Sequence, residues 1–207
     1  MVQGRLFCIG TCGGCLISFD STRRRLRAQR DALPEREASI LSQTVCRQIL
    51  SSPVYQQADS IAVYHAIERE CSLQVLVNHA WTAGKQVFLP ILHRELLEFG
   101  RWTEQTCLQK NRYGIDEPTS SESMKADKLD LVLAPLVAFD QHGTRIGMGG
   151  GYYDRTFAFL AERARSAGSR LVGVAYEFQR TALPDPRPWD IPLDAVVTEM
   201  GWQSITS

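Results

Sequence analysis

Apolar residues recur at helical spacing near the start of the chain. Leu41, Val45 and Ile49 lie four positions apart, as on one face of an amphipathic helix. Before them, Ser21 is a candidate cap for a helix that runs through an arginine-rich segment to Leu33. The proline that follows Leu33 interrupts or restarts the helix. The pattern therefore predicts two consecutive helices at the start of the fold.

Short apolar runs in the rest of the chain predict strands. They cover residues 60–64, 86–89, 96–102, 129–139, 171–175 and 195–198. The second run is expected to end at Pro90, and the polar stretch 111–128 predicts a long surface loop.

Two further helices are predicted between these strands. The first has Ser72 as its candidate cap and Gly84 at its end, and one face carries Leu73, Leu76, Val77, Ala80 and Trp81. The second follows Gly151 and ends at Gly168, with one face formed by Phe157, Leu160, Ala161 and Ala164.

The alternation of strands and helices indicates the fold class. The run 129–139 is nearly all apolar, as a central strand covered on both faces would be. A chain of 207 residues suits one domain better than two. We therefore expect a single three-layer, Rossmann-like α/β domain over residues 21–207, with a mostly parallel sheet and helices on both faces.

Composition and charge exclude several classes of protein. Hydrophobic residues make up 44% and charged residues 22% of the chain, which is ordinary for a globular domain. The formal net charge is zero, which argues against nucleic-acid or membrane partners. The sequence holds no apolar run long enough to cross a bilayer. Six cysteines in 207 residues do not make a disulfide scaffold, and they suit a cytoplasmic protein with reduced thiols.

Residues 1–20 differ from the rest. They hold Cys8, Cys12 and Cys15 and four glycines, and we expect a flexible extension with no part in catalysis. The Cys-x3-Cys-x2-Cys spacing is also that of a radical-SAM iron–sulfur site, which is the alternative. Such a site needs a large barrel after it, and the remaining sequence carries other signals.

The segment 140–151 is the strongest candidate for a binding site. It lies between a predicted strand and a predicted helix, and it places four glycines within residues 147–151. Backbone N–H groups in such a loop can form a phosphate-binding nest, which the N-terminus of the following helix would reinforce. Arg145 and Arg155 are suited to phosphate oxygens, and Asp154 to magnesium. The alternative is a glycine-rich turn without a ligand.

Two common phosphate motifs are excluded by inspection. A dinucleotide fingerprint needs glycine at its sixth position, which is Tyr152 when counted from Gly147. A Walker A loop needs Gly-Lys followed by Ser or Thr, but Gly84-Lys85 is followed by Gln86.

The run from Gly143 to Arg155, Gly-Thr-Arg-Ile-Gly-Met-Gly-Gly-Gly-Tyr-Tyr-Asp-Arg, resembles the signature of the 5-formyltetrahydrofolate cyclo-ligases. The resemblance extends from about Arg23 to the C-terminus. Its companion segments are 84–90, 114–118, 135–140, 173–179 and 190–199. It implies a single α/β domain with Rossmann-like layering, in agreement with the pattern of strands and helices.

The resemblance also implies site residues. ATP would contact Arg145, Ile146, Gly147, Met148, Gly149, Gly150, Gly151, Tyr152 and Tyr153, together with Arg23 and Arg27 near the start of the chain. The folate would contact Glu70, Met148, Gly149, Gly150, Gly151 and Tyr152. Magnesium would be bound by Asp154 and Asp190, and the catalytic set would be Arg145, Tyr152 and Asp154. Many members have a basic residue where this chain has Met148, which removes one possible phosphate partner.

The residues alone favour simpler interpretations for some of these positions. Glu70 would be a solvated loop charge, and Asp190 a turn aspartate between Pro188 and Pro192. The arginines of the segment Arg23–Arg30 would form a solvated helix face or a nucleic-acid patch. One alignment of this segment with the family places the conserved arginine at Arg23. Another alignment adds Arg27 to the site.

The implied reaction is the ATP-dependent closure of 5-formyltetrahydrofolate to 5,10-methenyltetrahydrofolate by a monomer, with Mg2+ as cofactor and ATP as co-substrate. One alternative is an RNA-binding protein that uses the arginine-rich helix, which the zero net charge disfavours. The other is an α/β protein that binds a nucleotide, sugar phosphate or CoA without this chemistry.

Overall fold

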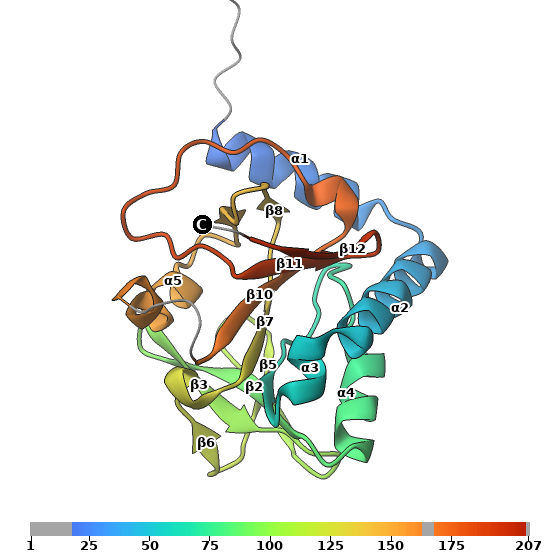
Figure 1. Cartoon of the computed structure of the whole chain (residues 1–207), viewed down its shortest axis with the longest axis vertical. Helices are drawn as coiled ribbons and strands as arrows, with labels where there is room; N and C mark the ends of the chain where they lie inside the picture. The colour runs from blue at the N-terminus through green and yellow to red at the C-terminus, as the bar shows by residue number, and fades with distance from the viewer. Residues whose placement is uncertain (1–17, 163–167, 206–207) are drawn as a thin grey trace, which may run out of the picture.

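The computed structural model describes residues 18–162 and 168–205 (Figure 1). The expectations for Cys8, Cys12 and Cys15 lie outside these residues, as does Ala164. Helix α1 spans Phe19–Asp31, and its cap is Ser18, whose side chain accepts a hydrogen bond from the Ser21 amide. The observed cap thus lies three residues before the predicted one, Ser21.

An eight-stranded sheet forms the centre of the fold, in the order β12-β11-β10-β7-β1-β2-β3-β6. Its five central members, β11, β10, β7, β1 and β2, pair in parallel, whereas β12, β3 and β6 are antiparallel to their neighbours. The mostly parallel sheet is therefore confirmed. The strands are β1 (Ser60–Ala62), β2 (Gln86–His93), β3 (Leu96–Arg101), β6 (Ser123–Met124), β7 (Leu131–Pro135), β10 (Arg170–Val174), β11 (Ala195–Thr198) and β12 (Gly201–Ser204).

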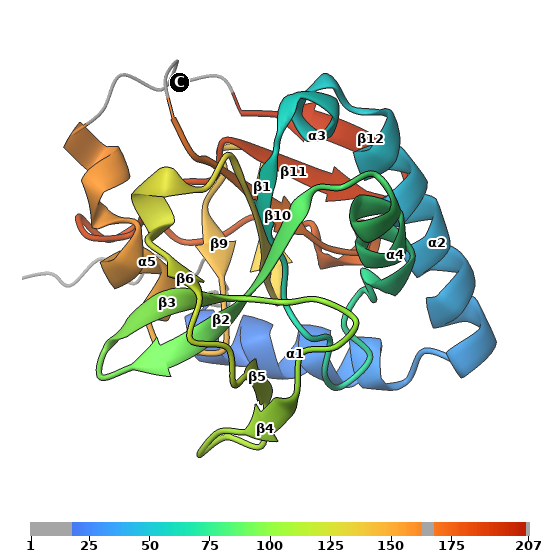
Figure 2. The same ribbon diagram turned by 90° about the horizontal axis from the view of Figure 1, so that it is seen from below.

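Both faces of the sheet are covered, which gives three layers (Figure 2). Alternate side chains such as Ile61 and Leu133 pack against α2 (Glu35–Ser51), α3 (Pro53–Gln57) and α4 (Gln74–Thr82). Their neighbours Ala62 and Val132 face the other way and pack with Phe157, which follows α5 (Tyr152–Thr156). This alternation is the period of two expected of a strand buried on both faces.

The strand order places a topological switch point at β1. The chain forms β1, adds β2 on one side, and returns to place β7 on the other side. Ligands of open α/β sheets bind beyond the carboxyl ends of the strands at such a point. The segment 63–73 leaves β1 there. The segment after β7 forms β8 (Ala138–Phe139) and β9 (Arg145–Ile146), an antiparallel pair, before the glycine loop.

The prediction that the second strand ends at Pro90 was wrong, since β2 continues to His93. β1 pairs with β2 only as far as Phe88. The Leu92 amide donates to the Glu117 side chain, so it faces away from β3. Backbone N–H groups alternate in direction along a strand, so the nitrogen of Pro90, two residues earlier, faces the same way. The missing N–H of Pro90 therefore lies on the side that β1 has already left, and no sheet hydrogen bond is lost.

Three other predicted elements differ from the structure. The apolar run 129–139 is divided into β7 and β8. The expected loop 111–128 contains β5 (Asp116–Pro118), β6 and a short 3-10 helix, and β5 pairs with β4 (Leu108–Lys110). The helix expected after Gly151 is only the five-residue α5, followed by the 3-10 turn Ala158–Glu162, because Phe157 leaves helical geometry to pack against Phe99. A helix this short adds little to anion binding.

Gly173 lies in β10, where the sheet is most tightly covered. A Cβ atom there would come within 2.6 Å of terminal methyl groups of both Leu136 and Leu193, which are buried. We expect Gly173→Ala to lower the free energy of unfolding by about 1–3 kcal/mol through overpacking. The melting temperature should fall by roughly 2–4 °C per kcal/mol. Adding Leu193→Val should restore part of the lost free energy of unfolding, as measured by urea denaturation. If the double variant is no more stable than Gly173→Ala, the overpacking explanation is contradicted.

Candidate functional site

Arginine side chains hold two backbone carbonyl groups of the glycine loop between β9 and α5. The Gly147 carbonyl accepts from Arg23 Nε at 2.9 Å, and the Gly150 carbonyl accepts from Arg155 Nη2 at 2.8 Å. Within residues 18–162 and 168–205, the amide N–H groups of residues 147–151 donate no hydrogen bond. Gly149 and Gly151 have φ of 98° and 65°, which glycine adopts most readily. The loop therefore presents free donors, as an anion cradle does.

Helix α1 reaches the loop through Arg23. A Cβ atom on Gly149 would lie 3.8 Å from the Arg23 guanidinium, which also pairs with Asp20. Arg27 instead pairs with Glu68 at 2.5 Å, on the segment that follows β1. Of the two predicted ATP-contacting arginines, the structure places Arg23 at the glycine loop and turns Arg27 toward Glu68.

Arg145 and Asp154 form an ion pair at the exit of the glycine loop. Arg145 Nη2 lies 2.7 Å from Asp154 Oδ1, and Arg145 Nη1 donates to the Ile191 carbonyl. The Ile191 amide donates to the same Asp154 oxygen at 3.2 Å. The segment that carries Asp190 is thereby fastened to Asp154. The Asp190 carboxylate itself accepts from the Arg187 amide at 2.9 Å, so the predicted turn aspartate is present beside the site.

The carboxylates of Asp154 and Asp190, the two predicted metal ligands, both lie in the part of the chain that the structure describes. Within the described part of the chain, no group of three or more His, Cys, Asp or Glu side chains could hold an ion. Each carboxylate has one oxygen bound to backbone or arginine donors, Oδ1 in Asp154 and Oδ2 in Asp190. One or two carboxylates with phosphate and water ligands is the usual arrangement for Mg2+, so this donor set fits that ion better than zinc or calcium.

Sequence reasoning missed the partners of Tyr152. The hairpin β4–β5 projects from the body of the fold (Figure 2), and its turn carries Arg112 and Tyr113. The Tyr152 hydroxyl lies 3.2 Å from the Tyr113 hydroxyl and 2.5 Å from Arg112 Nη2. These hydrogen bonds, from Tyr113 first and Arg112 second, lower the pKa of Tyr152. The neighbouring family segment 114–118 was the only sequence signal for this contact.

Tyr153 points into the protein rather than toward the cradle. Its ring stacks on Phe157 at a centroid distance of 6.1 Å, and burial raises the pKa of its hydroxyl. Its side chain therefore anchors the start of α5.

Glu70 forms a buried ion pair with Arg30, which was not predicted. The side chains of Arg30 and Glu70 are only 1% and 6% exposed, and Arg30 Nη1 lies 3.4 Å from Glu70 Oε1. Burial raises the pKa of Glu70, whereas the Arg30 charge and the Ile67 amide lower it. The simpler interpretation of Glu70 as a solvated loop charge was wrong. Arg23, Arg27 and Arg30 also turn inward, which leaves Arg24 and Arg25 on the solvated face of the helix.

A polar groove of about 430 Å³ opens beside Glu70, between the first turns of α2 and the segment after β1. Its wall includes Glu68 and Arg69, two successive residues with φ of 46° and 60°. Such angles are uncommon for residues with a side chain. The ion pairs of Glu68 with Arg27 and of Arg69 with Glu35 help to hold this turn.

The family relationship follows from comparison with known proteins. A family model of 5-formyltetrahydrofolate cyclo-ligases matches residues 18–199. The chain belongs to this family. Among curated members, the 5-formyltetrahydrofolate cyclo-ligase of Haemophilus influenzae is 35% identical over 82% of this chain and 90% of its own length. The Escherichia coli K12 member is 35% identical over 84% of this chain and 96% of its own length.

Solved structures of cyclo-ligase relatives agree with the fold. The 5,10-methenyltetrahydrofolate synthetase of Aquifex aeolicus superposes with a TM-score of 0.77 at 31% identity, over 91% of this chain and 93% of that one. The synthetase from Mycoplasma pneumoniae gives a TM-score of 0.70 at 22% identity, which supports the fold. The predicted single α/β domain of cyclo-ligase type is confirmed in fold class and in family. Within the described residues, no helix is long and apolar enough to span a membrane.

Proposed function

We propose that the chain catalyses the ATP-dependent closure of 5-formyltetrahydrofolate to 5,10-methenyltetrahydrofolate, with release of ADP and phosphate. The observation that supports this most is the glycine loop of a cyclo-ligase family member. Its amides at residues 147–151 donate no hydrogen bond within the described part of the chain, while Arg23 and Arg155 hold the Gly147 and Gly150 carbonyls. The loop lies beyond the switch point of the sheet, where a nucleotide is expected. The family relationship supports the identity of the folate.

The chemistry needs charge neutralisation more than a protein nucleophile. The formyl oxygen on nitrogen 5 attacks the γ-phosphorus of ATP, and ADP leaves. Nitrogen 10 then attacks the activated formyl carbon, loses its proton, and expels phosphate to give the methenyl product. Backbone amides aimed at the transferring phosphoryl group stabilise the negative charge of that step without reorganisation. We assign this role to the amides of residues 147–151.

The side chains around the loop complete the assignment. Arg145 holds Asp154 in place, because both of its Nη atoms already have acceptors. We propose that Tyr152, whose pKa is lowered by its hydrogen bonds with Tyr113 and Arg112, contacts the folate. We propose Glu70 for the pterin, since a buried carboxylate suits hydrogen bonds from an aminopyrimidine edge.

Asp154 and Asp190 would hold Mg2+ in this proposal. When bound, the ion supplies positive charge to the phosphate oxygens of ATP. The Ile191 amide ties the segment that carries Asp190 to Asp154, and the Arg187 amide orients the Asp190 carboxylate within its own turn.

We also place the protein in the cytoplasm. Cys46, Cys71 and Cys107, the cysteines of the described segments, are free thiols. Cys46 and Cys71 are buried, and burial raises the pKa of both, which keeps them as unreactive thiols.

The deciding experiment is direct. Purified protein with 5-formyltetrahydrofolate, ATP and Mg2+ should give the methenyl product, followed by its absorbance, with one ADP formed for each product. Omitting any one of the three should abolish the reaction. ATP and folate binding without product would instead support a nucleotide-binding α/β protein, and salt-dependent RNA binding without turnover would support the RNA alternative.

A further inference from the structure

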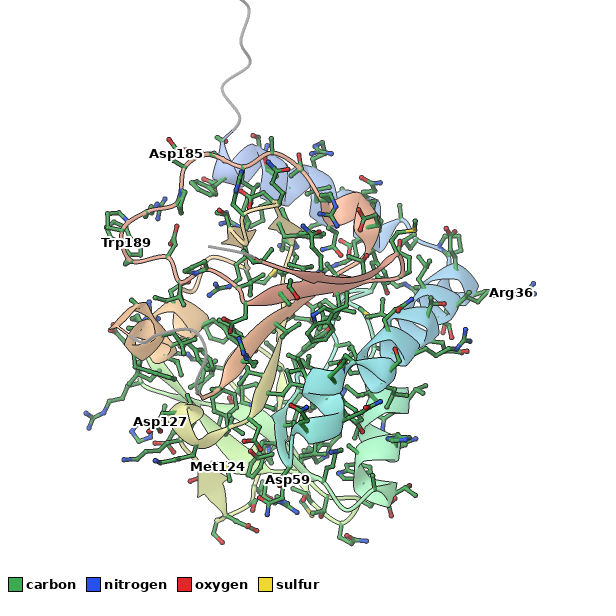
Figure 3. All side chains as sticks on the ribbon, in the orientation of Figure 1. Arg36, Asp59, Met124, Asp127, Asp185 and Trp189 are labelled. Carbon is green, nitrogen blue, oxygen red and sulfur yellow. The ribbon has the colours of Figure 1, made fainter. Side chains whose placement is uncertain are left out.

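Trp189 is exposed to an unusual degree for an indole. Trp189 is 63% exposed. It lies on the long loop between the 3-10 helix η3 (Glu177–Gln179) and β11. Figure 3 shows it at the outer edge of this loop, on the same loop as Asp185. The Arg187 guanidinium lies over the Trp189 ring, 5.8 Å from its centroid, and also over the Phe19 ring at 5.4 Å. We call Phe19, Arg187 and Trp189 the aromatic shelf.

One segment of the shelf is hydrogen-bonded to the glycine loop, residues 147–151, which we call the cradle, and the other segment to residues on either side of it. Phe19 begins α1, and one turn later Arg23 donates to the Gly147 carbonyl. Two residues after Trp189, Ile191 is hydrogen-bonded to Asp154 through its amide and to Arg145 through its carbonyl. The shelf therefore lies beside the cradle at a position fixed from two directions.

The cradle alone has no means of recognising a base. Its groups are backbone amides of glycines, which bind phosphate oxygens, and the exposed Met148 is its only large apolar side chain. A purine needs a flat, apolar surface, and an exposed aromatic ring backed by a guanidinium provides one. A single exposed apolar side chain is normal on a protein surface, and it is the position of this ring beside the glycine loop that suits it to a ligand.

We propose that Trp189, supported by Arg187, stacks on the adenine base of ATP while the glycine loop holds the phosphates. This inference rests on the proposed use of ATP, and it names the part of the chain that selects a nucleoside triphosphate over other polyphosphates. Trp189 is then a specificity-determining residue, outside the groups that stabilise phosphoryl transfer.

The test compares two ligands that share their phosphates. Calorimetry would measure Kd for ATP and for inorganic tripolyphosphate, each with Mg2+, in wild type, Trp189→Ala and Trp189→Phe. Loss of a stacked base weakens binding by roughly 5- to 150-fold, equivalent to about 1–3 kcal/mol. We therefore expect the ATP Kd of Trp189→Ala to rise within that range. Tripolyphosphate affinity should stay within about twofold, and Trp189→Phe should keep most of the ATP affinity.

Met200→Ala is the matched control, because Met200 is 76% exposed on the turn between β11 and β12. It should leave both affinities unchanged. An unchanged ATP affinity in Trp189→Ala would overturn the stacking role, and so would an equal loss for both ligands, which would indicate disruption of the cradle. A wild type that binds ATP but makes no methenyl product would overturn the proposed reaction and leave the stacking result to be judged separately.

Discussion

Asp154→Asn should lower kcat by at least about a hundredfold, because it removes the negative charge that we propose binds Mg2+ beside the phosphates of ATP. Loss of one comparable electrostatic contact in a transition state costs roughly 2.7–4 kcal/mol. Extra Mg2+ should recover part of the activity, since the variant binds the ion more weakly. The measurement is a Mg2+ titration of kcat in wild type and variant. A near-normal kcat with an unchanged Mg2+ midpoint would contradict a metal role.

The same substitution also weakens the fold, to a degree that the sequence did not indicate. Asp154 accepts from Arg145, whose side chain is nearly buried, and from the Ile191 amide. Hydrogen bonds to charged groups contribute about 1.5–3 kcal/mol, so thermal melts should show a moderate loss.

The matched control is Asp130→Asn. Asp130 accepts from the Asp59 and Ser60 amides where β1 begins, at the opposite edge of the sheet from the glycine loop. This variant should lose stability and keep its kcat and Mg2+ midpoint.

Arg30→Met should be the most destabilising substitution of a charged residue in α1. It leaves Glu70 buried without its countercharge, which typically costs about 3–5 kcal/mol. The second change Glu70→Leu should restore most of the stability, because buried ion pairs are often replaced by apolar residues without loss. Urea unfolding of both single variants and the double variant measures this. If the double variant loses as much free energy of unfolding as the two single variants combined, the pairing of Arg30 with Glu70 is contradicted.

The double variant also tests the role of Glu70. If Glu70 contacts the pterin, KM for 5-formyltetrahydrofolate should rise roughly 10- to 100-fold, as expected for a lost hydrogen bond to a charged group. KM for ATP should stay near the wild-type value, since Arg23 and the glycine loop are untouched. An unchanged folate KM would remove Glu70 from the folate site.

The pH dependence of stability has a definite sign for Glu70. Burial raises its folded pKa above the ordinary 4.5, so the folded state binds the proton more tightly than the unfolded state. This group therefore contributes added stability as the pH falls through its folded pKa, and the gain levels off below about 4.5. In the Arg30→Met variant the pKa of Glu70 loses the lowering effect of the Arg30 charge, so the gain in stability should begin at a higher pH and be larger.

The sequence predicted the architecture because its signals were local. The alternation of apolar runs with helices predicted the mostly parallel sheet, and the glycines of residues 147–151 predicted an irregular loop between a strand and a helix. What it could not predict were contacts between distant segments. Arg30 turns inward because it pairs with Glu70. The Tyr152 hydroxyl is held by Arg112, which lies in a β-hairpin where the polar composition had predicted a surface loop. The short α5 likewise follows from the packing of Phe157 on Phe99.

The hydrogen bond from Arg23 to Gly147 joins positions 124 residues apart. During synthesis, α1 leaves the ribosome long before the loop that it supports, so a partly made chain lacks a completed cradle. Contacts this distant in sequence form late, after the cost of closing the intervening chain has been met. We therefore expect nucleotide to bind the finished fold and not its precursors, and its binding would shift the equilibrium toward completion. Cellular ATP would in this way act as a ligand that favours the last stage of the protein's own folding.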